Sequence, residues 1–450
     1  MSDLLAARWQ MGISLGWHML FAAFGVTLPL LMVLAEGLGL LRRSPVHLQL
    51  ARRWSGVTAV LFAVGAVSGT ALSFELGLLW PRLMGFAGPV LGMAFFLEGF
   101  AFFAEAIFLG LYLYGWERLP AWGHWLSGLV VAVAGSASSV LVTAANAWMQ
   151  VPYGARTAAS DPLGAALGNP VWPRMAVHAT LAAWTAAAYA VAGWTAWRLL
   201  REPEGPLRAE RLAGLRLAML VALVGAVAMP VSGDASARQV AVREPVKLAA
   251  MEAQFTTRAA APLRIGGLPD PARRTVRWAL EIPAGLSWLA FRRGDATVRG
   301  LDAVPPSRWP PVTVTHVSFQ VMVGSSLLLV VAALLFWLRA ARSRPPRWSL
   351  RLLVAASPFG FVALETGWFV TEFGRQPWAV AGLMSTADAV TTGGGISFSL
   401  LGFILFYAAL SAAVVYFLRR LDSASPDPGE GPGDALREEP ALPGVPQRAH

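Results

Sequence analysis

Nine stretches of the sequence are apolar and long enough to cross a membrane. A helix needs about 20 apolar residues to span a bilayer, and only helices or closed barrels satisfy the backbone there. The 450 residues are 56% hydrophobic and 14% charged. The spans cover roughly residues 11–40, 54–79, 88–115, 124–150, 174–198, 215–232, 312–338, 350–373 and 395–419. We therefore expect an all-α polytopic membrane protein with about nine transmembrane helices.

Arginines in the short loops predict how these helices are oriented. One cluster follows the first span, and others join the fifth span to the sixth and the seventh to the eighth. The alternate short loops carry few basic residues. Because cytoplasmic loops are enriched in Arg and Lys, we expect the N-terminus outside and the C-terminus in the cytoplasm. A cleavable signal is not expected, since the first apolar run is too long for one.

The spans divide the chain into four parts. Residues 1–232 are expected to hold six helices, and residues 312–420 three more. Residues 233–311 form a long hydrophilic outer segment, and a connection of this length is usually functional. The tail at residues 421–450 is rich in Pro, Gly, Asp and Glu, which predicts disorder.

Composition excludes several kinds of chemistry. The chain has no cysteine, which excludes disulfides, iron–sulfur clusters, thiolate catalysis and covalent haem attachment. The net charge of +10 comes almost entirely from arginine, much of it in short loops, and does not indicate nucleic-acid binding. Ligands for a metal or cofactor must therefore be His, Met or carboxylates.

The eighth span ends in a polar stripe that is costly inside a membrane. Glu365, Trp368 and Glu372 lie at i, i+3 and i+7, so they share one face of a helix. A charged group at bilayer depth costs at least about 2.5–3.5 kcal/mol and usually faces a cavity, a partner or a cofactor. The alternative is a helix end that extends its charges to the interface, which applies best to Arg375.

Four possible metal ligands converge on the outer half of the membrane. His18, His178 and Met322 lie in helices that begin outside, and Glu372 ends a helix on the same side. A single intramembrane His is more often a hydrogen-bonded polar residue, and a single Met is more often core filler. Their convergence favours a metal or cofactor, and His with Met is a known pair of haem ligands.

Two acids in the third span form a second polar stripe. Glu98 and Glu105 lie seven residues apart among phenylalanines, so they share a face about 10 Å apart along the helix. Acids at this depth suggest a proton relay, and the alternative is two carboxyls hydrogen bonded to neighbouring helices. Ser138 lies among small polar residues of the fourth span, which predict either a hydrophilic path or helix packing.

Lys247 is the only lysine among 36 basic residues, and Glu252 follows five positions later. On a helix the two side chains would lie about 140° apart, so both could border one pocket. An ammonium group is a compact donor that can approach a small headgroup, whereas arginine suits carboxylates or phosphates. The alternative is two solvated loop charges.

Together these residues resemble subunit I of the cytochrome bd-type quinol oxidases, over about residues 5–420. The motifs are R-W-Q at 8–10, W-H-M-L-F at 17–21, E-G-F-A-F-F-A-E at 98–105, A-N-A-W-M-Q at 145–150, V-K-L-A-A-M-E-A at 246–253, F-Q-V-M-V at 319–323 and G-W-F-V-T-E-F-G-R-Q-P-W at 367–378. The last motif is the most diagnostic. The short outer segment also resembles the cyanide-insensitive branch, which can carry b haems in place of haem d.

The resemblance implies three haems: a low-spin haem b, a high-spin haem b, and a haem d or a further haem b. His178 and Met322 would ligate the iron of the low-spin haem. His18 and Glu372 would be axial ligands of the high-spin pair, and which haem takes which ligand stays open. Glu98 would adjoin the oxygen-reducing haem, as a further candidate ligand of its iron.

The resemblance also implies roles around the haems and at the substrate. These are cofactor binding by Arg375 and Trp378, electron transfer by Trp368, proton transfer by Glu105 and Ser138, and quinol binding by Lys247 and Glu252. Two positions depart from the family pattern. Gln320 stands where arginine is common, two residues before the candidate methionine ligand, and Ala235 stands where an acid is often found.

The activity implied is that of a terminal quinol oxidase in the bacterial cytoplasmic (inner) membrane, paired with a haem-free subunit II. Quinol would be oxidised at the outer face and O₂ reduced to water with cytoplasmic protons, which generates a proton motive force. Two other functions stay open. A haem-free proton-coupled transporter should show an internal repeat with interrupted helices, which the sequence does not show. A b-type electron carrier would lack oxygen chemistry.

Overall fold

The computed structural model describes residues 2–340 and 345–423, and this part of the chain is mostly helical. Within it, nine helices are long and apolar enough to cross a membrane. They are α1 (Asp3–Arg42), α2 (Pro45–Leu79), α3 (Pro81–Tyr114), α4 (Ala121–Gln150), α6 (Trp172–Arg201), α7 (Arg208–Arg243), α10 (Val312–Leu335), α11 (Arg347–Phe373) and α13 (Ile396–Ser423). The predicted fold class is confirmed. The tail predicted to be disordered lies almost wholly outside the described residues.

Several helices begin where the sequence supplies a proline. Pro45, Pro81 and Pro245 each stand in the first turn of a helix, where the missing N–H has no helical partner to lose. The third helix therefore begins at Pro81, before the apolar run predicted at residue 88, and only Trp80 separates α2 from α3. Apolar composition marks the membrane-crossing part of a helix, whereas proline marks its start.

Helix α7 extends past the boundary predicted at residue 233. The sixth apolar span is only the core of α7, which continues as helix to Arg243. Residues 233–243 are polar, so hydropathy does not detect this end of the helix, but helical hydrogen bonding continues through them. The first residues of the predicted outer segment therefore belong to a helix that continues from the sixth apolar span.

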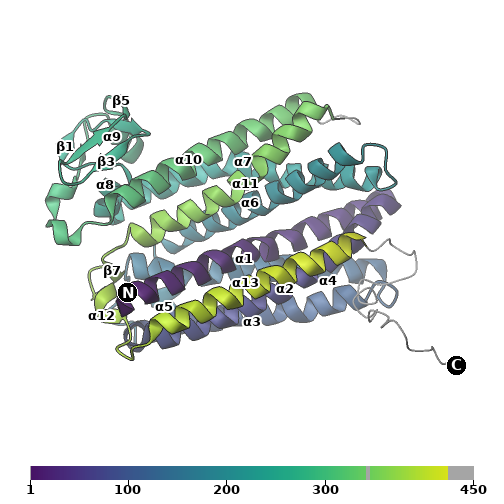
Figure 1. The fold of residues 1–450 in the computed structure, drawn as a ribbon, viewed down its shortest axis with the longest axis horizontal. Coiled ribbons are helices and arrows are strands. Elements are labelled where there is room, and N and C mark those ends of the chain that lie inside the picture. The colour runs from purple at the N-terminus through teal and green to yellow at the C-terminus, as the bar shows by residue number, and fades with distance from the viewer. Residues whose placement is uncertain (1, 341–344, 424–450) are drawn as a thin grey trace.

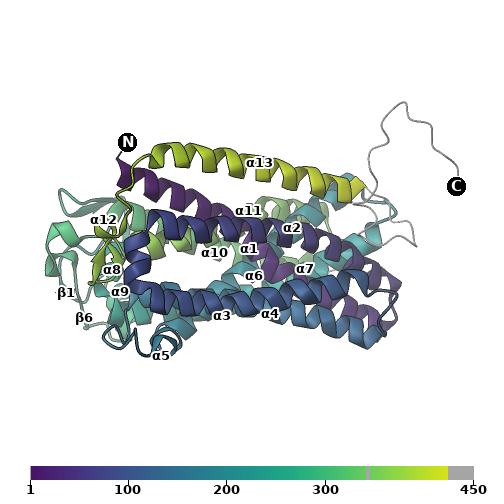
Figure 2. The same cartoon turned by 90° about the horizontal axis from the view of Figure 1, so that it is seen from below.

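The long helices run side by side in two groups, with α1 next to both. Figure 1 shows α6, α7, α10 and α11 in its upper part and α1–α4 with α13 in its lower part. The closest neighbours are α1 with α2, α3 with α4, α6 with α7 and α11, and α10 with α11. The main apolar core joins α1, α2, α6, α7, α10 and α11 through residues such as Leu31, Tyr189, Met219 and Leu353. Figure 2 shows α3 and α4 together along one side.

The segment between α7 and α10 folds against one end of the bundle (Figure 1). It contains α8 (Pro245–Met251) and α9 (Gly285–Phe291). Three antiparallel strand pairs are β1 (Arg258–Ala259) with β6 (Thr297–Val298), β2 (Leu263–Ile265) with β5 (Leu280–Ile282), and β3 (Leu268–Asp270) with β4 (Thr275–Arg277). The remaining short elements are α5 (Pro162–Leu167), β7 (Trp378–Val380), β8 (Met384–Ser385), α12 (Thr386–Ala389), η1 (Leu301–Ala303), η2 (Pro306–Arg308) and η3 (Phe336–Ala340).

Two residues of α10 fasten this segment to the bundle. His316 is fully buried, with Nδ1 2.8 Å from the Met251 carbonyl and Nε2 3.2 Å from the Gly266 carbonyl. Gln320 donates to the Arg264 carbonyl at 3.1 Å and accepts from the Gly266 N–H at 2.9 Å. His316 and Gln320 therefore hold the outer segment in register with α10.

Candidate functional site

His18 on α1 presents one ring nitrogen for metal binding. Its Nδ1 lies 2.9 Å from Ser68 Oγ on α2, and the Ser68 hydroxyl donates its single proton to the Gly65 carbonyl at 3.0 Å. Ser68 must therefore accept from Nδ1–H, which leaves the lone pair on Nε2. This is how a hydrogen bond to one nitrogen fixes the tautomer of a ligating imidazole. Gly69 faces the ring, and a Cβ there would lie 3.2 Å from Cε1.

His178 and Met322 show similar surroundings in the other group of helices. Nδ1 of His178 on α6 lies 3.1 Å from Ser232 Oγ on α7, and Gly233 leaves space beside the ring. Met322 on α10 faces Gly367 on α11, where a Cβ would lie 3.1 Å from the sulfur. Since α6, α7, α10 and α11 pack against one another, both residues belong to one part of the bundle.

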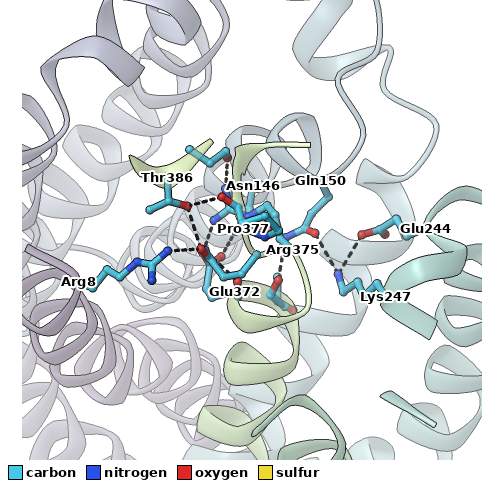
Figure 3. A network of polar contacts seen from close by, with 12 residues as sticks. Arg8, Asn146, Gln150, Glu244, Lys247, Glu372, Arg375, Pro377 and Thr386 are labelled. Carbon is cyan, nitrogen blue, oxygen red and sulfur yellow. Dashed lines mark hydrogen bonds and ion pairs between the residues drawn. The ribbon is translucent and has the colours of Figure 1, made fainter. Parts of the chain in front are cut away.

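Glu372 is held at the end of α11 by one residue of α4 and one residue of the turn that follows α11 (Figure 3). Asn146 on α4 donates to Glu372 Oε1 at 2.6 Å, and Arg375 pairs with Oε2. Arg375 is 8% exposed and also donates to the Ala379 carbonyl. Its guanidinium is therefore a buried partner of Glu372 and does not extend to an aqueous interface.

A line of hydrogen bonds connects Glu372 to Lys247 (Figure 3). Gln150, one turn beyond Asn146 on α4, donates to Asn146 Oδ1 at 3.3 Å. Its Oε1 accepts from Lys247 Nζ at 3.0 Å, and Lys247 also pairs with Glu244 at 3.0 Å. Lys247 is 6% exposed, so the alternative of a solvated loop charge is wrong for it.

Glu252 caps the other end of α8, and the hydrogen bonds of the Lys247 ammonium group go to Gln150 and Glu244 instead. It is 4% exposed, and its Oε2 has no hydrogen-bond partner among the described residues. Burial raises the pKa of Glu252 to about 7, and the nearby charge of Arg264 opposes the rise. This carboxyl can take up or release a proton near neutral pH, and it too is not a solvated loop charge.

The two acids of α3 face α4, as their shared face requires. Ser138 donates to Glu98 Oε1 at 3.3 Å. Glu105 is 5% exposed and lies against Gly135, where a Cβ would come within 3.1 Å of Oε1. The structure therefore brings Glu98 and Ser138 together and places Glu105 in the same seam between α3 and α4.

The other candidate residues near Glu372 lie on α11 and in the strand that follows it. Trp368 packs against an apolar cluster that includes Met19, Ala183 and Leu364, where α1, α6 and α11 meet. Glu365 lies against Gly16 of α1, and a Cβ there would approach Oε2 to 3.3 Å. Trp378 begins β7 and pairs with Ser385 of β8. The stripe on α11 thus faces the interior of the bundle.

Sequence reasoning missed a buried acid close to His18. Glu75 on α2 is 1% exposed, and its Oε1 accepts from Ser14 at 2.7 Å and from Gln10 at 3.2 Å. Glu75 lies seven residues after Ser68, the partner of His18, so both face α1. The seven-residue spacing from Ser68 could have placed Glu75 on the face of α2 that packs against α1. Glu244 was also missed, because its role depends on Lys247 lying one turn away.

The donor set fits haem at separate places and not a compact metal ion site. Among residues 2–340 and 345–423, no three His, Asp or Glu side chains gather into a metal-binding group. Instead, His18, His178 and Met322 come from three different helices, and each side chain faces a glycine of a neighbouring helix. Glu372 stands beside a buried arginine, which suits an acidic cofactor. Single axial ligands with space beside them are what haem requires.

Comparison with known proteins identifies the family. The chain matches the family model described as "Cytochrome bd terminal oxidase subunit I" over residues 6–426. A Bacillus subtilis protein, provisionally named as subunit I of a cytochrome bd menaquinol oxidase, is 37% identical over 93% of this chain and 96% of its own length. Subunit 1 of a cytochrome bd ubiquinol oxidase from the same organism is 32% identical over 94% of each chain.

A solved structure shows the same architecture. The bd oxidase structure from Geobacillus thermodenitrificans matches with a TM-score of 0.88 and 36% identity, covering 94% of this chain and 99% of that chain. The nine apolar helices and the seven motifs agree with this likeness. The chain therefore belongs to the subunit I family of cytochrome bd terminal oxidases and is a quinol oxidase subunit, a multi-pass membrane oxidoreductase.

Proposed function

We propose that this subunit oxidises quinol at the outer face of the bacterial cytoplasmic membrane and reduces O₂ to water with cytoplasmic protons. The observation that carries the proposal is the hydrogen-bonded line from Lys247 through Gln150 and Asn146 to Glu372. It joins the candidate substrate lysine to the candidate haem ligand at one end of the bundle. A haem-free subunit II and the surrounding lipid would complete the enzyme.

Lys247 and Glu252 would bind and deprotonate the quinol headgroup. Lys247 would donate a hydrogen bond to a quinol oxygen, since Glu244 and Gln150 already hold its ammonium group in place. Glu252 has an unpartnered buried oxygen and a pKa of about 7, so its ionised form can accept a hydroxyl proton. His316 and Gln320 would keep this segment fixed on α10 while quinol binds.

His178 and Met322 would hold a low-spin haem b, and His18 and Glu372 two high-spin haems, with Arg375 and Trp378 beside Glu372. When bound, these haems supply the electron transfer and oxygen chemistry. Trp368 would pack between cofactors where α1, α6 and α11 meet. Asn146 and Arg375 would orient the Glu372 carboxylate.

Glu105, Ser138 and Glu98 would carry protons along the seam between α3 and α4. The Ser138–Glu98 hydrogen bond and the burial of Glu105 in the same seam support this role. Because oxygen reduction would consume protons from one side and quinol oxidation would release them on the other, charge separation would follow without a pump.

An optical spectrum of the purified oxidase, with and without dithionite and then with CO, tests this function together with quinol-driven oxygen consumption. We expect low-spin and high-spin haem signals, a CO-sensitive species and rapid oxygen consumption. Protein purified without haem would favour the transporter. A low-spin haem alone, without oxygen consumption, would favour the electron carrier.

A further inference from the structure

A buried His–Glu pair lies at the end of the bundle opposite Lys247. Glu36 is near the last turn of α1 and His124 near the first turn of α4, whereas the other ends of these helices lie near α8 and the N-terminus (Figure 1). Each residue is 2% exposed. Glu36 Oε1 and His124 Nδ1 are 2.6 Å apart, and His124 Nε2 is 2.9 Å from the Tyr112 carbonyl on α3.

The hydrogen bonds require this pair to hold a transferable proton. A carbonyl oxygen can only accept, so His124 Nε2 must carry a hydrogen directed at Tyr112. The short contact between Nδ1 and Glu36 then needs one more proton, either on the imidazole or on the carboxyl. In both cases that proton lies between two groups that can each bind it.

Two buried polar groups lie next to each other beside the pair. The Tyr112 hydroxyl is close enough to interact with the Glu36 carboxyl, but neither Tyr112 Oη nor Glu36 Oε2 makes a well-formed hydrogen bond among the described residues. Buried polar atoms are rarely left unpaired, and ordered water is the usual partner. The Tyr112 ring lies 4.2 Å from the His124 ring, centroid to centroid, so both groups belong to one cluster. The cluster is therefore a place where water would contact the Glu36 carboxyl.

The cluster continues the acidic face of α3. Tyr112, Glu105 and Glu98 are spaced at seven residues, so they lie on one side of the helix, about 10 Å apart in sequence order. Tyr112 and Glu105 each face a glycine of α4. A Cβ at Gly128 would lie 2.6 Å from the Tyr112 ring, and a Cβ at Gly135 would lie 3.1 Å from Glu105 Oε1. One seam thus leads from the His–Glu pair to the middle of the bundle.

The cluster is also close to the aqueous surface. The Trp116 ring lies 4.1 Å from the His124 ring, centroid to centroid. The Arg52 guanidinium lies over the Trp116 ring, 5.6 Å from its centroid. Arg52 pairs at 3.6 Å with Glu117, whose side chain is 76% exposed. A chain of contacts thus leads from His124 through Trp116 and Arg52 to the exposed Glu117.

We propose that the Glu36–His124 pair takes up protons at this face and delivers them, through water at Glu36 and Tyr112, to Glu105. The pair would pass the proton that it holds between His124 Nδ1 and Glu36 to the water, and one proton from the aqueous face would restore its starting state. The inference rests on the proposed function and names the start of its proton route.

The test uses Glu36→Gln in the purified, haem-loaded oxidase, with Glu210→Gln as control. Gln keeps the shape and the hydrogen bond to His124 but does not titrate. Glu210 is a buried carboxylate at the same end of the bundle that pairs with Arg53 at 2.6 Å, away from the α3–α4 seam. Proton uptake is measured with a pH-indicator dye after oxygen is mixed with the reduced enzyme.

We expect Glu36→Gln to slow proton uptake and saturated turnover at least fivefold, with an unchanged KM for quinol and an unchanged haem spectrum. Glu210→Gln should stay within twofold of the unmodified enzyme, and Glu36→Asp should recover much of the uptake rate. If Glu36→Gln does not assemble, His124→Gln is measured instead with the same expectation. Uptake at the unmodified rate in either variant would overturn the proposal.

A parallel Glu105→Gln variant separates this inference from the proposed function. Slow uptake in Glu105→Gln with normal uptake in Glu36→Gln would reject the pair and keep the route through Glu105. Normal uptake in Glu105→Gln would reject the route itself.

Discussion

Gln150 on α4 accepts a 3.0 Å hydrogen bond from Lys247 on α8, two residues that are 97 positions apart in the chain. Through its amide nitrogen, the same Gln150 side chain reaches Asn146 and the Thr371 carbonyl. The short helix α8 is thereby tied to the end of α11 that carries Glu372. Substitution of Lys247 should therefore alter quinol binding first, and substitution of Asn146 should alter haem binding.

Replacing Lys247 with Arg should weaken quinol binding although it keeps the charge. Gly374 packs tightly on the lysine stem, since a Cβ there would lie 2.8 Å from Lys247 Cγ. A guanidinium cannot occupy the space of the ammonium group between Gln150 and Glu244. We expect the KM for quinol to rise at least fivefold, with oxygen consumption from an artificial one-electron donor unchanged. Arg243→Lys, at an exposed position on the end of α7, is the matched control. Equal loss with both donors would place the defect at the haems.

The rate of quinol oxidation should depend on the ionisation of Glu252. Burial raises its pKa to about 7, so kcat/KM for quinol should increase as the pH rises through that value. Glu252→Gln should lower kcat/KM at pH 8 at least tenfold and remove the step near pH 7. Glu281→Gln is the control, because Glu281 pairs with the same Arg264 at 2.9 Å but is exposed, whereas Glu252 only lies near its charge. A step that persists in Glu252→Gln would exclude this base.

The same group should make stability depend on pH. The pKa of Glu252 is higher in the folded protein than its ordinary value of 4.5, so the folded state binds this proton more tightly than the unfolded state. The stability that proton binding contributes is complete below pH 4.5 and is lost as the pH rises through about 7. Thermal unfolding of Glu252→Gln should therefore vary less than that of the unmodified protein between pH 5 and 8.

Met322→Leu should affect one haem only. The substitution keeps the side-chain volume, which costs less than about 1.5 kcal/mol, but removes the sulfur ligand. We expect loss of the low-spin haem signal or its conversion to high spin, with the high-spin haems retained. Met219→Leu, in the fully buried core of α7, should leave the reduced spectrum intact. An unchanged spectrum in Met322→Leu would show that this methionine is not a ligand.

Asn146→Leu should disturb the haem at Glu372 and spare the quinol site. It removes the 2.6 Å hydrogen bond to Glu372 Oε1, and a hydrogen bond to a charged group contributes about 1.5–3 kcal/mol. We expect altered high-spin haem absorbance or reduced haem content, measured as pyridine haemochrome. Gln150→Leu, one turn along α4, should instead raise the KM for quinol and keep the haem content. If Asn146→Leu raised the KM for quinol and kept the haem content, while Gln150→Leu lowered the haem content, Glu372 would not be a haem ligand.

The sequence by itself determined the features that depend on local order. Nine apolar spans predict nine helices because length and hydropathy are sufficient for membrane crossing. Helical periodicity places Glu98 with Glu105, and Glu365 with Glu372, on shared faces. The use of one lysine among arginines marked Lys247 before any contact was visible. The motifs were sufficient to assign the family.

Only the tertiary structure decided which residues meet across helices. Asn146 and Glu372 are 226 positions apart, Glu36 and His124 are 88 apart, and Gln10 and Glu75 are 65 apart. Periodicity fixes the face of one helix, but it does not fix the register between two helices. That register is set by the packing of many side chains at once, together with the loops that join them. For this reason Glu36 and His124 had no visible role in the sequence, and only their packing showed them as a buried pair.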